Sequence, residues 1–226
     1  MRRNKWMLSG LVLTLFAFSA GETWGYSTDL ASIRNSFTVM DLQPDIRAVL
    51  TEPSWQPEKG LLLLPGQSVP KDPMIENISG TNSEELAAIR ISFLYSSACP
   101  FEEWRGSLLS EEDMKLVAEV FEIDYNADRS TPGWFRFDGE TKESRIQHFY
   151  YGNSLKRNAP GRGDMTSPLF TAVKVPSAVA GTQYSRIQEI GGFDLKVEGC
   201  VLERTKDGDC ESAEKACHSG CFRFSD

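Results

Sequence analysis

SPLFTAVKVP at residues 167–176 and GGFDLKVEGCVL at residues 191–202 are the two stretches that decide the fold class. Each alternates its side chains with a period of two, which predicts strands with one buried face. In the first stretch one face holds Leu169, Thr171, Val173 and Val175, and the other holds Phe170, Ala172 and Lys174. In the second, Phe193, Leu195, Val197 and Val201 lie opposite Asp194, Lys196 and Glu198.

Neither stretch, nor the polar linker between them, carries a nucleophile motif, a metal-ligand constellation or a phosphate-binding loop. The most informative part of the sequence is therefore architectural, and it indicates function through assembly or binding. The chain has 226 residues, of which 40% are hydrophobic. This length fits one domain with a core of its own.

The N-terminal segment has the pattern of a secretory signal peptide. Arg2, Arg3 and Lys5 precede an apolar run from Trp6 to Ala20. The run is shorter than the roughly 18 residues of a typical membrane span, although an uncleaved anchor is the alternative. We expect residues 1–25 to be removed by a signal peptidase, and the remaining protein to be secreted.

The chain is acidic, with a formal net charge of −8, and loss of the basic leader makes it more so. This charge disfavours nucleic acid and anionic membranes as partners. Apolar alternation predicts further strands, and a capping box at Ser110 begins a predicted helix at about 109–122. The predicted strands are residues 35–42, a short piece at 61–64, an edge segment at 69–78, 85–96, and a hairpin of 134–138 with 147–152.

The aromatic side chains of that hairpin have two interpretations. Phe149, Tyr150 and Tyr151 are consecutive, and exposed aromatic rings of this kind stack on sugars. Alternating aromatic residues in a sheet are more often core on one face and cross-strand pairs on the other.

Six segments in order resemble the TasA and camelysin-like proteins of Gram-positive bacteria, which are exported with the signal peptidase SipW. They are ASIRNSFTV, LLPGQSVPKDPMIENISGTN, IRISFLYS, GWFRFDGETKES, FYYGNSLKRNAPGRGDMTSPLFTAVKVP and IGGFDLKVEGCVLE. The resemblance covers nearly all of the chain after the leader. It implies an all-β, jelly-roll-like β-sandwich in residues 26–203 and a structural role as a subunit of a biofilm matrix or surface fibre.

The resemblance also suggests how subunits would associate. In such relatives the N-terminal segment completes the sheet of a neighbouring molecule, which adds a full row of main-chain hydrogen bonds. We expect residues 26–42, with Phe37 and Val39 as apolar anchors, to serve as this donor strand. The alternative is that the strand pairs within its own sheet.

The chain departs from the family pattern in two places. A longer turn, LKRNAPGRGDMTS, precedes the PLFT strand, and a cysteine-containing tail, residues 204–226, follows the last strand. The camelysin branch has been classed as metallopeptidases, yet this chain has only His148 and His218 and no His-Glu-x-x-His motif. We therefore expect neither catalytic residues, nor a cofactor, nor a resident metal. A monomeric secreted binding or adhesion module for a polysaccharide or host surface is the second functional class.

The chain contains five cysteines, and four of them lie near the C-terminus: Cys200, Cys210, Cys217 and Cys221. In an exported protein one or two disulfides among these four would stabilise a tail too small to bury its own core. Two alternatives stay open. Cys210, Cys217, His218 and Cys221 supply metal-binding atoms, although at an uncommon spacing, and the thiols could also remain reduced.

Overall fold

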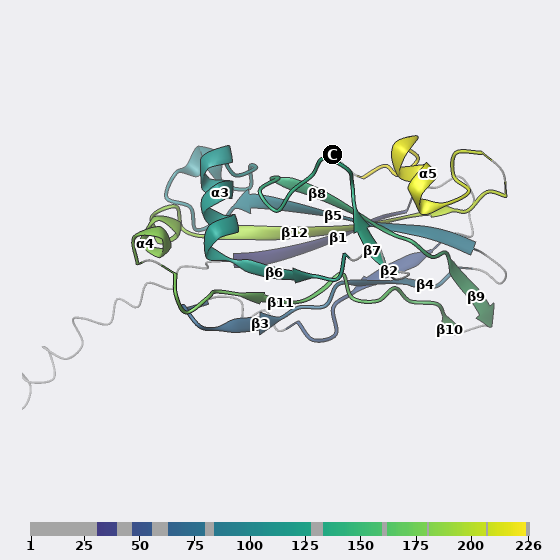
Figure 1. The fold of residues 1–226 in the computed structure, drawn as a ribbon, viewed down its shortest axis with the longest axis horizontal. Helices are drawn as coiled ribbons and strands as arrows, with labels where there is room; N and C mark the ends of the chain where they lie inside the picture. Colours follow the sequence, from purple (N-terminus) through teal and green to yellow (C-terminus); the bar gives the residue numbers. More distant parts are fainter. Residues whose placement is uncertain are drawn as a thin grey trace, which may run out of the picture.

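The computed structural model describes residues 31–39, 47–55, 63–79, 84–127, 133–159, 162–179, 181–206 and 208–224. Within these ranges the chain is mostly β-strand, arranged in three sheets with three α-helices (Figure 1). The predicted all-β class is confirmed. The predicted signal peptide, residues 1–25, lies outside the described residues.

The main sheet is built on a long antiparallel pair, β5 (Glu84–Tyr95) and β12 (Phe193–Glu203). Their register runs from Phe193 opposite Tyr95 to Glu203 opposite Glu85. The order across this sheet is β1-β12-β5-β8-β7, and β9 pairs with the start of β5 and with β10. The added strands are β1 (Ala31–Val39), β8 (Ile146–Tyr151), β7 (Trp134–Arg136), β9 (Leu155–Ala159) and β10 (Arg162–Gly163).

Two smaller sheets cover one face of the main sheet. The first has the order β3-β11-β6 and the second pairs β2 with β4. Figure 1 shows β6, β11 and β3 running beneath the long strands. Apolar side chains from the facing surfaces of all three sheets form one buried core. The strands are β3 (Ser68–Pro70), β11 (Phe170–Lys174), β6 (Glu122–Tyr125), β2 (Ala48–Thr51) and β4 (Met74–Asn77).

Several predicted strands are confirmed, and others change their limits. The hairpin of β7 with β8 and the strand β5 are found where the alternation predicts them. The N-terminal strand begins earlier than predicted, at Ala31, and the segment 69–78 divides into β3 and β4. Of the short piece at 61–64, Leu63 is buried and Leu64 is exposed, and the two residues before them lie outside the described residues.

Strand β11 does not keep the alternation that its sequence predicts. Leu169 and Phe170 are consecutive and both fully buried, whereas Thr171 is exposed. The pairing with β6 shifts register between Phe170 and Val173. Such an irregularity turns neighbouring side chains to the same side, which explains why a strict two-residue period fails here.

The prediction of a single helix is wrong, because the described residues form three α-helices. Helix α3 (Glu111–Val120) is the predicted one, and the Ser110 side chain accepts a hydrogen bond from the Asp113 backbone N–H at 3.1 Å. Helix α4 (Gly181–Glu189) lies in the polar linker between the two stretches, where no helix was predicted. It is short and polar and buries only Tyr184 and Ile187, so its apolar pattern is weak.

Helix α4 ends in a tight turn that returns the chain to β12. Gly191 has φ of +74°, and a Cβ atom there would lie 2.6 Å from the Ala98 carbonyl oxygen. Only glycine fits both the backbone conformation and the close approach. The turn therefore sets where β12 begins.

The C-terminal tail covers the other face of the main sheet. Helix α5 (Ala213–His218) and the residues after it pack on side chains that β5, β8 and β12 direct away from the main core. The Phe222 ring lies 5.3 Å from the ring of Tyr150, and the Arg90 guanidinium lies 5.1 Å from the ring of Phe224. Both faces of the central strands are thus buried.

A disulfide closes this tail on itself. Cys210 is bonded to Cys221, with the Cα atoms 6.4 Å apart, so the bond encloses α5. Three cysteines are outside this disulfide: Cys200 is buried beneath the tail, Cys217 is buried within α5 of the tail itself, and Cys99 is buried in the main core. Of the four cysteines predicted to form one or two bridges, two form one bridge.

Replacing Cys210 and Cys221 by serine should lower the free energy of unfolding of the tail by about 2–3 kcal/mol. The disulfide reduces the conformational entropy of the unfolded loop, and for a loop of this length the effect has that size. Hydrogen exchange should show loss of protection in residues 213–224 while β5 and β12 stay protected. The matched control is Asp209→Ser, an exposed position beside the bond. Unchanged exchange in the double variant would contradict the stabilising role.

Candidate functional site

The N-terminal strand β1 is the edge strand of the main sheet, and it pairs with β12 of its own chain. The pairing is parallel, from Ala31 opposite Phe193 to Val39 opposite Val201, and Phe37 lies opposite Gly199. Every other strand pair among the described residues is antiparallel. The structure of the single chain therefore has the intramolecular pairing that the sequence left as an alternative.

The aromatic hairpin does not form an exposed stacking platform. Phe149 and Tyr151 point into the main core, and Tyr150 lies beneath the tail. Their exposed fractions are 0%, 9% and 6%. The core interpretation of these residues is confirmed, and stacking of a sugar on them is excluded by their burial.

The histidines and cysteines do not assemble a metal site. His148 Nδ1 lies 2.7 Å from the Glu140 carboxylate on the tail-covered side of the sheet. His218 lies near the ring of Phe137, with the ring centres 6.0 Å apart. In the part of the chain that the structure describes, no group of three or more His, Cys, Asp or Glu side chains is arranged to hold a metal ion.

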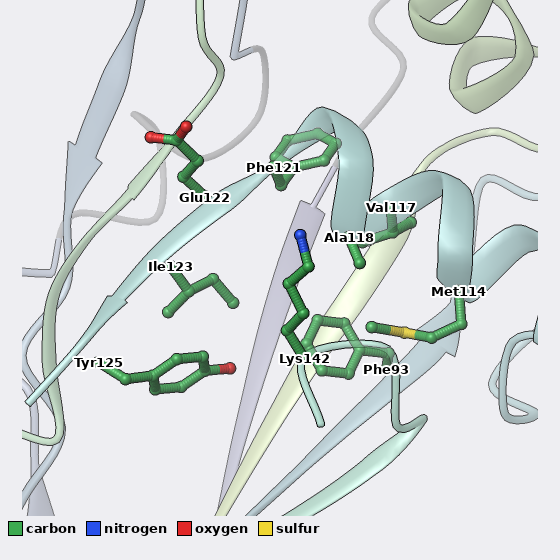
Figure 2. Close-up of a pocket in the computed structure, with 9 residues that line it drawn as sticks. All are labelled: Phe93, Met114, Val117, Ala118, Phe121, Glu122, Ile123, Tyr125 and Lys142. Carbon is green, nitrogen blue, oxygen red and sulfur yellow. The ribbon is translucent and has the colours of Figure 1, made fainter. Parts of the chain in front are cut away.

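An apolar pocket opens between α3, β6 and the main sheet (Figure 2). Its volume is about 160 Å³, close to that of a cavity that holds one small aromatic ring. The apolar lining comes from β5, α3 and β6: Phe93, Met114, Val117, Ala118, Phe121 and Ile123. This lining would exclude water from most of a small apolar guest.

Tyr125 supplies the polar group inside the pocket. Its ring stacks on Phe149 at 4.8 Å and meets the edge of Phe170 at 5.7 Å, and the Arg136 guanidinium lies 5.1 Å from the ring centre. The ring is thus held on several sides, and Figure 2 shows the hydroxyl directed into the pocket. The hydroxyl is buried and has no hydrogen-bond partner among the described residues. Burial raises the pKa of Tyr125, so the group is a neutral donor.

Charged side chains stand at the pocket mouth. Lys142 extends across the opening, and the Glu122 carboxylate is turned away from it (Figure 2). Among the described residues Lys142 forms no ion pair. A buried phenol with a free ammonium at the entrance suits a small apolar molecule that carries a carboxylate.

Sequence reasoning missed this pocket. Tyr125 ends a short strand and Lys142 lies in the β7–β8 connection, so no spacing in the sequence relates them. The only local signal was the apolar face of the predicted helix, which supplies Met114 and Val117. The pocket exists because packing brings these three segments together.

A carboxyl group with an altered pKa lies at the other end of β5. Glu85 is fully buried, and the Ser79 hydroxyl donates a hydrogen bond to it. Burial raises the pKa of Glu85 to about 7, and the nearby Glu203 carboxylate acts in the same direction. At pH values between about 4.5 and 7, the Glu85 carboxylate therefore takes up a proton when the protein folds.

Two short motifs, a glycosylation sequon and an Arg-Gly-Asp tripeptide, have structural roles. Asn77 of the sequon Asn77-Ile78-Ser79 is fully buried and donates to the Leu155 carbonyl at 3.1 Å. Asp164 of the Arg-Gly-Asp tripeptide accepts a hydrogen bond from the Lys156 backbone N–H at 2.8 Å. Both side chains connect strands within the fold.

Comparison of the chain with protein-family models, curated proteins and solved structures gives no match. None of the helices in the described ranges is long and apolar enough to cross a membrane.

The Tyr125→Phe substitution should leave the free energy of unfolding unchanged or raise it by up to about 1 kcal/mol, because it removes a buried hydroxyl without a partner. Tyr184→Phe is the matched comparison. The Tyr184 hydroxyl donates to the Leu63 carbonyl at 2.6 Å, and losing that donor should cost about 1–2 kcal/mol. Urea unfolding of both variants measures the difference, and an equal loss in the two would show that Tyr125 has a partner.

Stability should fall as pH rises from about 4.5 to about 7, because the folded state holds a proton on Glu85 that the unfolded state releases. Above about pH 7 Glu85 is ionised in both states, so its contribution to the free energy of unfolding no longer changes with pH. The free energy of unfolding is measured at pH 5 and at pH 8. The decrease between these two pH values should be about 2–3 kcal/mol smaller in the Glu85→Gln variant than in the unsubstituted protein. Glu143→Gln, at an exposed position, is the control and should keep the dependence of the unsubstituted protein.

Proposed function

We propose that this protein is a secreted structural subunit of an extracellular matrix or surface fibre, assembled by exchange of β1 between neighbouring molecules. The observation that carries the proposal is the position of β1. It is the first described strand, it lies at a sheet edge, and β12 is its only partner strand among the described residues. A terminal edge strand can leave its sheet without disrupting the order of the other strands.

The energetics of exchange favour this mechanism. If β1 of one molecule occupies the same place beside β12 of another, the parallel pairing is kept in full. Exchange of an identical element therefore costs little beyond the loss of translational freedom. The residues between Val39 and Arg47 would then connect two molecules rather than two sheets of one molecule. Phe37 and Val39 would keep their places opposite Gly199 and Val201, as anchors of the donor strand.

The remaining parts of the proposal rest on the sequence. The resemblance to TasA and camelysin-like proteins suggests a jelly-roll topology, export with the SipW signal peptidase and a location in a biofilm matrix. The acidic composition agrees with a soluble precursor that does not bind nucleic acid or anionic membranes. The role proposed is structural and involves no catalytic residues.

A second candidate function is a monomeric secreted binding module, and the pocket at Tyr125 favours it. The pocket is apolar apart from its phenol and, at its mouth, Lys142 and Glu122, whose carboxylate is turned away from the opening. It therefore suits a small aromatic carboxylate better than a polysaccharide or a host surface. Saturable binding of such a compound by a protein that stays monomeric at all concentrations would support this function over the first.

Trapping β1 in its own molecule should prevent assembly. Thr38 lies opposite Cys200 in the β1–β12 register. Neighbouring strands are about 4.8 Å apart, within the range of Cα separations that a disulfide spans. Oxidation of a monomeric Thr38→Cys variant of the protein starting at Tyr26 should link these positions, and peptide mapping would verify the bond.

Light scattering and electron microscopy then compare the linked variant with Thr38→Ser, which cannot form the bond. Filaments from Thr38→Ser and none from the linked variant are the expected result. Equal assembly of both would reject β1 exchange. If the unsubstituted protein forms no filaments at any concentration, with or without extra residues before Tyr26, the fibre function itself is wrong.

A further inference from the structure

A lysine and a glutamate meet in the interior beside the two smaller sheets. Glu52 follows the end of β2, and Lys71 lies between β3 and β4. Their side chains are 3% and 0% exposed, and the Lys71 ammonium nitrogen contacts the Glu52 carboxylate. The other lysine–carboxylate pairs of the described chain are less fully buried, as for Lys156 with Glu84, where the exposed fractions are 56% and 32%.

The surroundings hold the two groups against each other. The Lys71 nitrogen lies 4.8 Å from the centre of the Trp55 ring. The Ser54 N–H and hydroxyl both donate to the Asp72 carboxylate, each at 2.8 Å. Backbone bonds join Trp55 N–H to the Glu52 carbonyl at 3.1 Å and Lys71 N–H to the Thr171 carbonyl at 3.1 Å. These contacts fix the backbone on both sides of the pair, and burial keeps water away from the two groups.

Burial makes the charged pair costly and the amine reactive. Removing two charges from water carries a desolvation cost that their attraction often fails to offset. Burial lowers the pKa of Lys71 to about 8, although the Glu52 carboxylate opposes this shift. At neutral pH a fraction of about one in ten of such amines carries no proton and has a free lone pair.

We propose that Lys71 and Glu52 condense to form an intramolecular isopeptide bond. The ammonium first gives a proton to the carboxylate, which produces a neutral amine beside a neutral carboxylic acid. The Lys71 nitrogen then attacks the Glu52 carboxyl carbon, and the C–N bond forms. One carboxyl oxygen leaves as water with two protons from the original ammonium, and a secondary amide remains. No oxidation occurs and no other reactant is needed.

Two features drive this reaction forward. Holding amine and acid in contact raises their effective concentration, which reaches on the order of 10⁵–10⁸ M in well-oriented intramolecular reactions. The product is a neutral amide in place of two buried charges, so the desolvation cost of the pair disappears. An exposed pair such as Lys156 with Glu84 has neither advantage, because water separates and solvates its members.

The bond would join the end of β2 to the β3–β4 connection, and so tie the two smaller sheets together. Strand β2 is the next strand after β1 along the chain. Tension arriving through an exchanged β1 would pass into the β3–β11 sheet through a covalent bond. The chemistry itself does not depend on fibre formation, so the cross-link and the proposed function can fail separately.

Mass spectrometry of the unfolded, reduced protein of defined N-terminus tests the proposal. The expected mass is lower than that of the sequence by one water molecule. Trypsin should then yield residues 48–59 linked to residues 60–90, with no cleavage after Lys71. A full sequence mass, with free peptides ending at Lys59 and Lys71, would overturn the proposal. Fragmentation must place the loss at Glu52 and Lys71, since a succinimide at Asp138-Gly139 or Asp207-Gly208 gives the same mass.

Two variants complete the test. Lys71→Arg keeps a positive charge but cannot form the amide, so its mass should equal that of its sequence. Lys156→Arg, at the exposed pair, should retain the loss of one water. The result for the unsubstituted protein decides the question even if Lys71→Arg fails to fold. Loss of water in Lys71→Arg, or its absence in Lys156→Arg, would assign the reaction to other residues.

Discussion

The antiparallel pairing of β5 with β12 is the constraint on which the rest of the structure depends. These are the longest strands among the described residues, and their inner face is apolar over most of its length. Their outer face is apolar only where the end of β12 lies beside the start of β5. One face is covered by the smaller sheets and α3. The other needs a second cover, which the disulfide-closed tail provides at Leu86, Ala88 and Leu202. The tail is therefore part of the fold, because without it the outer face of the central pair would lie open to water.

The two edges of β12 pair with strands that differ in direction and in their position along the chain. One is occupied by β5 in a long antiparallel register, and the other by β1 in a parallel one. A parallel pair is slightly less stable per residue than an antiparallel pair, and β1 comes from the opposite end of the chain. This is the strand that we propose is exchanged between molecules, since the same hydrogen bonds would form in either arrangement.

Buried polar groups in this protein meet their desolvation cost in different ways. Burial raises the pKa of Glu85 to about 7, so its carboxyl group is protonated below neutral pH, and Tyr125 keeps a neutral hydroxyl turned into a pocket. Lys71 and Glu52 meet in a pair where the cost of two charges is largest. Each of these properties results from burial. Each also puts a polar or ionisable side chain at a buried position that an apolar side chain would normally occupy.

The sequence by itself determined what local periodicity and capping encode: the strands β5, β8 and β12, the helix begun by Ser110, and the all-β class. It did not reveal α4, whose apolar face is only Tyr184 and Ile187, nor the bulge that buries Phe170 in β11. The tertiary structure alone decided that β1 lies beside β12, that Cys210 joins Cys221, and that Tyr125 shares a pocket with Lys142. These relations connect residues far apart in the chain or choose among equivalent partners, and short-range patterns carry no information about which distant segments will pack together.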